Sequence, residues 1–348
     1  MNTEFFEALT LLEKEKSISK EYLLEKIRNA IIVAIKRDGE NNEDPIVEID
    51  PGSGRFYVAF RKRVVEELLD PANEILLEQA VSLDKKAIIG GTVEIPMQTK
   101  QFGRIAAQAA KHVIRQGIRE GERQQLLEEY QSRQNDIVTA IVMRTDERKG
   151  IVTLEIGKNE AMLPKNEQIP GETFKDGERI RIYVVDVMIS EKGPRLMISR
   201  THPGLVKRLF EIQVPEITDG TVEIKAIARE AGSRTKIAVW SKDENVDAQG
   251  ACIGSKGARV GDIVDELGGE KIDVVKYSND PAKFIAEALS PAQVVGVEIE
   301  DESAKVCRVT VPDHQLSLAI GNKGQNARLA ARLTGWKIDI RPVSGNLN

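Results

Sequence analysis

The stretch 250-GACIGSKGARVGDIVDELGGEKIDVV-275 returns in a second form, 317-SLAIGNKGQNARLAARLTGWKIDI-340. In both, a short helical run ends in isoleucine and leads through Gly-x-Lys-Gly into an amphipathic helix, a glycine and Lys-Ile-Asp. Upstream of each stretch lie a helix opened by proline (HPGLVKRLFEI and DPAKFIAEAL) and two strand-like runs. The repeat predicts two copies of one α/β unit with the order helix, strand, strand, helix, Gly-x-x-Gly, helix, strand.

The two glycine turns, 254–257 and 321–324, each lie between predicted helices. Glycine has no side chain and allows backbone angles closed to other residues, so an RNA backbone can come into contact with the turn. The following helix offers its N–H groups to a phosphate, and the lysine of each turn adds a positive charge. KH domains hold about four nucleotides in this way. We therefore predict RNA binding by the turns and nearby arginines: Gly254, Ser255, Lys256, Gly257, Arg259, Gly321, Asn322, Lys323, Gly324, Arg328 and Arg332.

Local charge favours phosphate contact at these turns, although the whole chain has a net charge of -5. No acidic residue occurs between Asp247 and Asp262 or between Asp313 and Asp339, where the turns lie. A solvated helix face is the alternative explanation of such basic stretches. The aliphatic residues around the turns are interpreted mainly as core, with some able to line a groove for the bases: Ile253, Val260, Ile263, Leu267, Ile320, Leu329 and Leu333.

Residues 134–200 contain five short strand-like runs separated by turn segments. This spacing predicts a small closed barrel, for which the OB-fold is the common five-stranded form; a fragment of a β-sandwich is the alternative. Barrels that bind single strands stack bases on aromatic side chains. The segment holds only Phe174 and Tyr183, and neither lies in GIVTLEI or EAMLP, where such a platform is expected. We therefore expect the barrel to serve mainly as a spacer.

Residues 1–133 have the pattern of an α+β head that ends in a long helix. Helical runs precede the strand-like runs IVEID, RFYVAF and TVEIP, and a proline-free helical pattern then extends over 99–133. Basic residues recur along this helix at the helical period, and no acid occurs between Glu94 and Glu120. An ordinary solvent-facing surface is the alternative. We predict that this basic stripe contacts RNA or an acidic protein surface: Lys100, Arg104, Lys111, Arg115 and Arg119.

The composition argues against several other classes of protein. Cys252 and Cys307 lie far apart and out of metal-ligand spacing, as expected of two buried thiols in a reducing cytosol. The three histidines show no metal spacing, and neither a Gly-x4-Gly-Lys-Ser/Thr phosphate loop nor His-Glu-x-x-His occurs. No signal peptide and no apolar run of about 20 residues is evident. We expect a cytoplasmic protein with no catalytic residues, metal, cofactor or membrane association.

These segments together resemble the NusA family of bacterial transcription elongation and termination factors, over essentially the whole chain. The resemblance is carried by EFFEALTLLEKEK, DPANEILLEQA, FGRIAAQAAKHVIRQ, SRTHPGLVKRLFEIQVPEI and the two glycine-turn stretches. It implies a multidomain α+β fold. The implied domains are an N-terminal RNA-polymerase-binding domain with a long linking helix (1–133), an OB-fold barrel of the ribosomal-protein S-one type (134–200), and two tandem type II KH domains (201–278 and 279–348).

The resemblance also implies the function. Members of the family bind bacterial RNA polymerase through the N-terminal domain and hold nascent single-stranded RNA, so that they modulate pausing, termination and antitermination. Other Nus-type factors and the Rho termination factor are further expected partners, and a monomer is expected. Some members carry acidic repeats at the C-terminus. Because this sequence stops at Asn348, functions that depend on those repeats are expected to be absent.

Two other functions use the same modules. KH and S-one-type domains also accompany phosphorolytic ribonucleases, but the small, helical head leaves little room for a catalytic domain. A translation or ribosome-assembly factor is the second alternative, and only the head domain argues against it.

Overall fold

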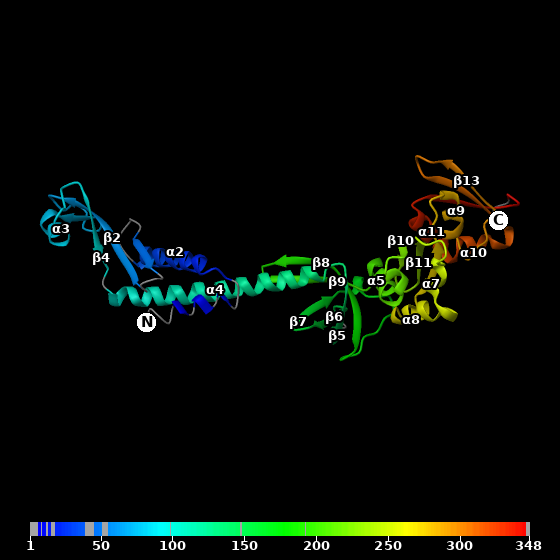
Figure 1. The fold of residues 1–348 in the computed structure, drawn as a ribbon, viewed down its shortest axis with the longest axis horizontal. Coiled ribbons are helices and arrows are strands. Elements are labelled where there is room, and N and C mark those ends of the chain that lie inside the picture. Colours follow the sequence, from blue (N-terminus) through cyan, green and yellow to red (C-terminus); the bar gives the residue numbers. More distant parts are fainter. Residues whose placement is uncertain are drawn as a thin grey trace. The chain divides into compact units, whose positions relative to one another are not determined.

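The computed structural model describes residues 6–7, 9–11, 13–14, 18–38, 45–50, 55–97, 99–146, 148–191 and 193–345, and at 55 and 99–106 it describes the backbone alone. The chain divides into two compact units, Met1–Glu128 and Glu129–Asn348. Figure 1 labels most of the helices and strands of both. In the described part of the chain, no helix is long and apolar enough to cross a membrane.

The N-terminal unit packs helices against a small mixed sheet. Strand β2 pairs with all three other strands: β1 and β4 run antiparallel to it and β3 runs parallel. The second helical run buries an apolar stripe against the sheet, with Ile27 and Ile31 fully covered. The elements are α2 (Lys20–Asp38), β1 (Ile46–Asp50), β2 (Arg55–Val65), β3 (Glu74–Leu76), α3 (Leu77–Leu83), β4 (Thr92–Pro96) and α4 (Thr99–Ser132).

The long helix α4 has the length that its sequence pattern predicts. Ala110 and Val113 join the core formed by α2 and the sheet. A Cβ on Gly117 would lie 2.8 Å from Cδ2 of Leu23, so α4 passes close to α2 at this point. The buried face therefore includes positions 110, 113 and 117, spaced at three and four residues as a helical stripe requires.

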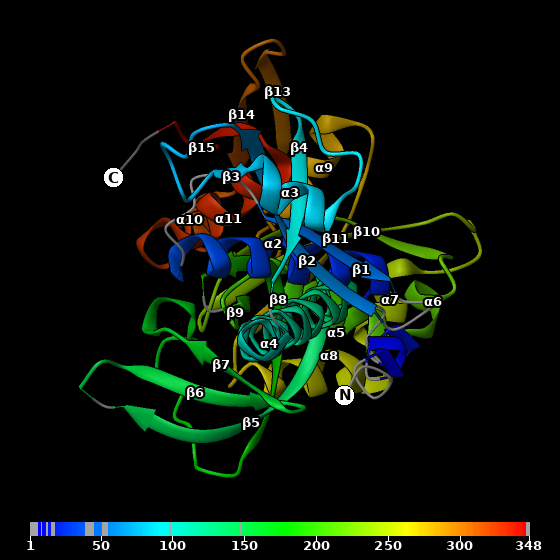
Figure 2. The ribbon, with the colours of Figure 1, turned by 90° about the vertical axis from the view of Figure 1, so that its left-hand side faces the viewer.

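The second unit begins with the predicted five-stranded barrel. All neighbouring strands are antiparallel, in the order β7-β6-β5-β8-β9, and the two end strands β7 and β9 also lie against each other. Figure 2 shows β5, β6 and β7 side by side. The nearly closed barrel confirms the OB-type prediction over the sandwich fragment. The strands are β5 (Ile137–Asp146), β6 (Ile151–Ile156), β7 (Asn159–Leu163), β8 (Arg179–Ser190) and β9 (Gly193–Ser199).

The repeated sequence folds into two domains of the same topology, as predicted, which are called the first and the second repeat. In each, two antiparallel strands are followed by a third strand that runs parallel to the second. Pro203 and Pro281 stand at the first turn of the helices that open the two repeats. The first repeat contains α5 (Pro203–Gln213), α6 (Pro215–Thr218), β10 (Val222–Glu230), β11 (Arg234–Ser241), α7 (Ala248–Ile253), α8 (Ala258–Glu266) and β12 (Lys271–Lys276). The second contains α9 (Pro281–Ala288), β13 (Gly296–Asp301), β14 (Val306–Val311), α10 (Leu316–Ile320), α11 (Gln325–Thr334) and β15 (Lys337–Pro342).

Apolar clusters join the barrel and the two repeats, which together form the compact unit Glu129–Asn348. One cluster combines Tyr183 of the barrel with Leu205 and Phe210 of α5. Another combines Ala238 of β11 with Leu329 of α11, so the sheet of the first repeat is covered on one side by helices of the second. The domain boundaries at 200/201 and 278/279 stay predictions, and buried contacts cross both of them.

Candidate nucleic-acid interface

The two glycine turns have the same backbone geometry. Gly254 has φ 75° and ψ 175°, and Gly321 has φ 75° and ψ 172°. Two residues on, Lys256 has φ 53° and ψ 26°, and Lys323 has φ 51° and ψ 29°. Each turn closes with a left-handed glycine that opens the next helix. The repeated sequence thus builds one structure twice, including a lysine in a conformation that residues other than glycine rarely adopt.

The first glycine of each turn is required by packing as well as by its backbone angles. A Cβ on Gly254 would lie 2.7 Å from Cγ of Arg259, and one on Gly321 would lie 2.8 Å from Cβ of Asn326. By contrast, a Cβ on Gly257 would meet no atom within 4 Å. The leading glycine therefore lets the turn close on its own helix, and a substitution there tests folding together with RNA contact.

The turn lysines extend into solvent. Lys256 and Lys323 are exposed, as are their neighbours Ser255 and Asn322. Within the described residues, neither ammonium group has a hydrogen bond or an ion pair. Both positive charges are therefore available to an anionic ligand beside the first N–H groups of α8 and α11.

The predicted arginines all have partners inside the protein. Arg259 donates through Nη1 to Glu216 Oε2 at 2.9 Å and to the backbone oxygen of Ala251 at 2.6 Å. Arg328 and Arg332 pair with Glu230 at 3.3 and 3.8 Å. RNA contact by the three arginines stays a prediction, and any such contact shares the guanidinium with a carboxylate.

The aliphatic residues near the turns divide between the core and the surface beside the turns. Leu267, Leu329, Ile263 and Leu333 are buried, and Val260 is half-buried. The isoleucine directly before each turn is not a core residue, and its position fits the groove-lining role that the sequence left open. These two residues, Ile253 and Ile320, are both 37% exposed because they end short helices whose opposite side faces the core. Their exposed methyl groups lie beside the lysine turns, where a base could contact them.

A hollow of about 400 Å³ separates the second turn from the first repeat. Lys271 is exposed at its wall, whereas Arg234 is held by Asp273 in a bidentate ion pair. The hollow therefore offers polar and basic groups between the two repeats. Its walls include Gly321, Asn322 and Gln325 of the second repeat and Ser233, Arg234 and Lys271 of the first.

The barrel has a second hollow, of about 650 Å³, at the β5–β6 end. Three basic residues line it (Arg144, Arg148 and Lys149). None of these three side chains has a hydrogen bond or ion pair to a described residue. The sequence predicts only a turn at DERKG (146–150), and the density of basic residues in and beside this turn is the signal for the hollow. Tyr183 cannot supply a stacking platform here, because it is buried and stacks on His202 with ring centroids 4.8 Å apart.

The predicted basic stripe of α4 is described only in part. Lys111, Arg115 and Arg119 are exposed, on positions that alternate with the buried residues of this helix. Lys100 and Arg104 belong to α4, but their side chains lie outside the described residues. The contact proposed for the stripe stays a prediction.

Comparison with known proteins decides the family. Family models match three segments: the NusA N-terminal domain at residues 4–124, the NusA-like first KH domain at 200–277 and the NusA-like second KH domain at 281–347. The chain belongs to the NusA family. A protein of Halalkalibacterium halodurans named transcription termination/antitermination protein NusA is 51% identical over 99% of this chain and 89% of its own length. A protein of the same name from Bacillus subtilis is 51% identical over 98% of this chain and 91% of its own length. One from Thermus thermophilus is 44% identical over 97% of this chain and 89% of its own length.

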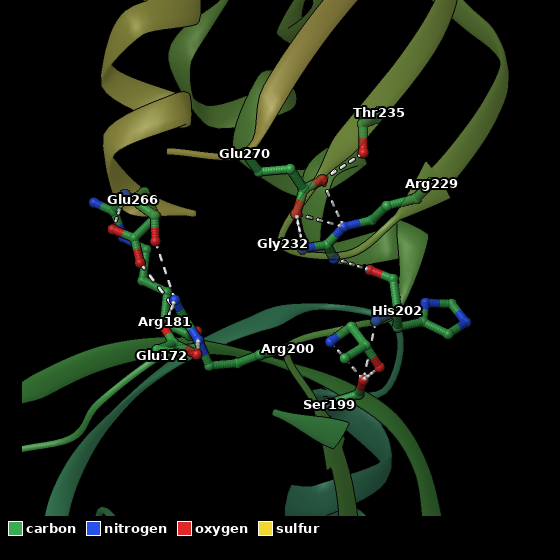
Figure 3. Close-up of polar contacts among 11 residues, drawn as sticks. Glu172, Arg181, Ser199, Arg200, His202, Arg229, Gly232, Thr235, Glu266 and Glu270 are labelled. Atoms are coloured by element: carbon green, nitrogen blue, oxygen red, sulfur yellow. Dashed lines mark hydrogen bonds and ion pairs between the residues drawn. The ribbon is translucent and has the colours of Figure 1, made fainter. Parts of the chain in front are cut away.

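In this NusA-family chain, a buried arginine connects the barrel to the first KH domain (Figure 3). The side chain of Arg200 is 2% exposed; its Nε donates to Glu172 Oε2 at 3.0 Å, and its Nη2 donates to the backbone oxygen of Glu266 at 3.0 Å. Glu266 is the last residue of α8, and a cation is favourable at that end of a helix. The barrel therefore contacts the C-terminal end of the helix that begins at the first glycine turn.

Metal and thiol chemistry find little support among the NusA-family residues that the structure describes. No group of three or more His, Cys, Asp or Glu side chains in this part could hold a metal ion. The two cysteines are buried and unpaired with each other. Burial raises the pKa of the Cys252 thiol to about 12 and that of the Cys307 thiol to about 11, so both stay protonated at neutral pH.

Proposed function

We propose that this NusA-family chain, a transcription termination and antitermination protein, holds nascent single-stranded RNA at its two glycine turns while its N-terminal unit binds RNA polymerase. The observation that carries the RNA half is the pair of turns with one geometry, each with an exposed lysine that no described carboxylate neutralises. Contacts of this kind go mainly to phosphates, so the affinity should fall as salt rises. Attachment to polymerase would keep the transcript close, so weak RNA binding would suffice.

The basic hollow of the barrel extends the proposed RNA path. Arg144, Arg148 and Lys149 could bind phosphates without stacking any base. We therefore propose that the barrel contributes charge to RNA binding in addition to contacting the helix that begins at the first turn, which goes beyond the spacer role expected from its lack of aromatic residues.

The polymerase half of the proposal rests on exposed apolar side chains of the N-terminal unit. They gather in the segment between β2 and β4, which includes α3, and two of them are especially exposed: Leu69 at 86% and Ile88 at 71%. Apolar residues exposed in such numbers are typical of protein-binding surfaces. The set is Leu68, Leu69, Val81, Leu83, Ile88 and Ile89. The basic stripe of α4 is a second candidate surface, for the polymerase or for the exiting RNA.

Charged substitutions in this segment should strongly weaken polymerase binding. We expect Leu69→Glu combined with Ile88→Glu to weaken binding to purified bacterial RNA polymerase by about 100-fold, since a buried carboxylate without a partner is costly. Binding is measured by surface-immobilised polymerase titrated with the full chain. Val33→Glu is the matched control, because Val33 is 65% exposed on α2 of the same unit. Equal affinities for all three proteins would rule this surface out.

Two experiments with the unsubstituted chain separate the transcription proposal from its alternatives. If the chain recovers ribosomal subunits from a bacterial lysate in preference to RNA polymerase, a ribosome-assembly function is favoured instead. Decay of single-stranded RNA in the presence of the purified chain would favour a ribonuclease. We further propose that the chain acts in the cytoplasm together with RNA polymerase, with other Nus-type factors and the Rho termination factor as additional partners.

A further inference from the structure

The carboxylate of Glu230, at the end of β10 in the first KH domain, faces α11 of the second. Its Oε2 accepts a hydrogen bond from Gln325 Nε2 at 2.8 Å, and its Oε1 lies 3.3 Å from Arg328 Nε and 3.8 Å from Arg332 Nη1. Hydrogen bonds from Gln325 and, to a smaller extent, from Arg328 lower the pKa of Glu230, so its carboxylate is ionised at neutral pH. The carboxylate of Glu230 in the first KH domain therefore contacts three side chains of the second KH domain.

These contacts reach the second glycine turn directly. Gln325 is the residue that follows Gly324 and begins α11. Its side-chain amide also donates to Ser233 Oγ at 2.7 Å, in the turn between β10 and β11. The orientation of the N–H groups at the start of α11, which would face a phosphate, is therefore set by the first KH domain.

The first repeat has no equivalent of this arrangement. Counting from the glycine turns, Gln325, Arg328 and Arg332 correspond to Ala258, Gly261 and Asp265. None of these three side chains could donate to a carboxylate in the manner of the second repeat. The two repeats share their backbone geometry, but only the second carries these donor side chains after its turn. They lie where α11 contacts the first KH domain.

We propose that Glu230 is a positioning residue that fixes the second glycine turn relative to the first KH domain, so that the two turns together favour RNA with one narrow range of spacing between the two held segments. This inference rests on the proposed function. The hollow between the domains is consistent with a path for the intervening RNA, because Ser233 and Gln325 form part of its wall. Two linked sites bind best when the spacer matches the distance between them, and the preference is sharp only if that distance is fixed.

The test uses two tetra-adenylate RNA segments joined by polyethylene glycol spacers of graded length, titrated with the full chain by fluorescence anisotropy. For the unsubstituted protein, we expect one best spacer, with affinity lower by about ten-fold at clearly shorter and longer spacers. For Glu230→Ala, we expect affinities that vary by no more than about two-fold across the series, with unchanged affinity for a single tetra-adenylate. Glu223→Ala is the matched control, because Glu223 lies on the same strand and pairs with Lys225 and Lys242 of its own domain.

Each outcome bears on the inference. A variant that keeps the spacer preference of the unsubstituted chain overturns it, as does a uniform loss of affinity that includes the single segment, which would mean a purely structural role. A flat spacer series already in the unsubstituted chain also overturns it, while leaving RNA binding at the turns intact. If instead neither segment binds, the proposed function itself fails.

Discussion

Reversing the charge of both turn lysines, with Lys256→Asp and Lys323→Asp, is expected to weaken single-stranded RNA binding by about 100-fold or more. A hydrogen bond to a charged group contributes about 1.5–3 kcal/mol, and two such bonds are replaced by repulsion. Aspartate tolerates left-handed backbone angles better than most residues, so the turns should keep their geometry. Fluorescence anisotropy over a salt series measures the effect. The slope of log Kd against log salt should fall by about 0.7 for each phosphate that the turns no longer neutralise.

A third lysine provides the matched control for this substitution. Lys305 also has a left-handed backbone (φ 52°) and is exposed, but it lies in the turn between β13 and β14. Lys305→Asp therefore changes the net charge and the local conformational demand as much as either turn substitution alone, without touching a glycine turn. If it weakened binding as much as either turn substitution, the effect would be one of overall charge, and the turns would lose their assignment.

The second large effect is on stability, at the ion pair between Arg229 and Glu270. Both side chains are 0% exposed and lie 2.9 Å apart, and Glu270 also accepts from Thr235 Oγ1 and from the backbone N–H of Gly232 (Figure 3). Arg229→Ala leaves a buried carboxylate without its cation, which is expected to cost about 3–5 kcal/mol of the free energy of unfolding. In a unit of this size, that corresponds to a fall in Tm of about 6–20 °C.

Calorimetry of the full chain measures this fall in the transition of the second unit. Arg341→Ala is the control, because Arg341 pairs with Asp339 at 2.8 Å on the surface, with side chains 48% and 47% exposed. Such pairs contribute about 0–1 kcal/mol. A loss in Arg229→Ala no larger than in the control would mean that water or another group compensates the buried carboxylate.

Local sequence patterns were sufficient to predict most of the architecture. In and just before the two glycine-turn stretches, glycine, proline and apolar spacing mark the ends of the helices and strands. Each stretch folds into the predicted order of helices and strands. The five strand-like runs of 134–200 likewise form the expected barrel, and the proline-free pattern over 99–133 forms α4. In these segments the signal lies within a few residues of the structure it determines.

Contacts between distant segments could not be predicted in this way. Lys236 has the character of a surface residue in the sequence, yet it is fully buried, with Nζ bound to Asp273 and to the backbone oxygen of Ser290. Arg328 and Arg332 stand in an acid-free stretch of sequence, but the fold brings Glu230 to them from about 100 residues away. Absence of acids nearby in sequence therefore says little about pairing in space. Ile253 and Ile320 show the same limit, since helical spacing alone does not reveal which side of a two-turn helix is covered.

The role of the turns in transcription is tested most directly by the half-life of RNA polymerase at a hairpin-dependent pause, measured in vitro with bacterial polymerase and this protein. The unsubstituted chain should lengthen the pause, and the chain with Lys256→Asp and Lys323→Asp should lose most of that effect while still binding polymerase. An equally long pause with the lysine variant would contradict RNA holding by the glycine turns as the basis of the activity.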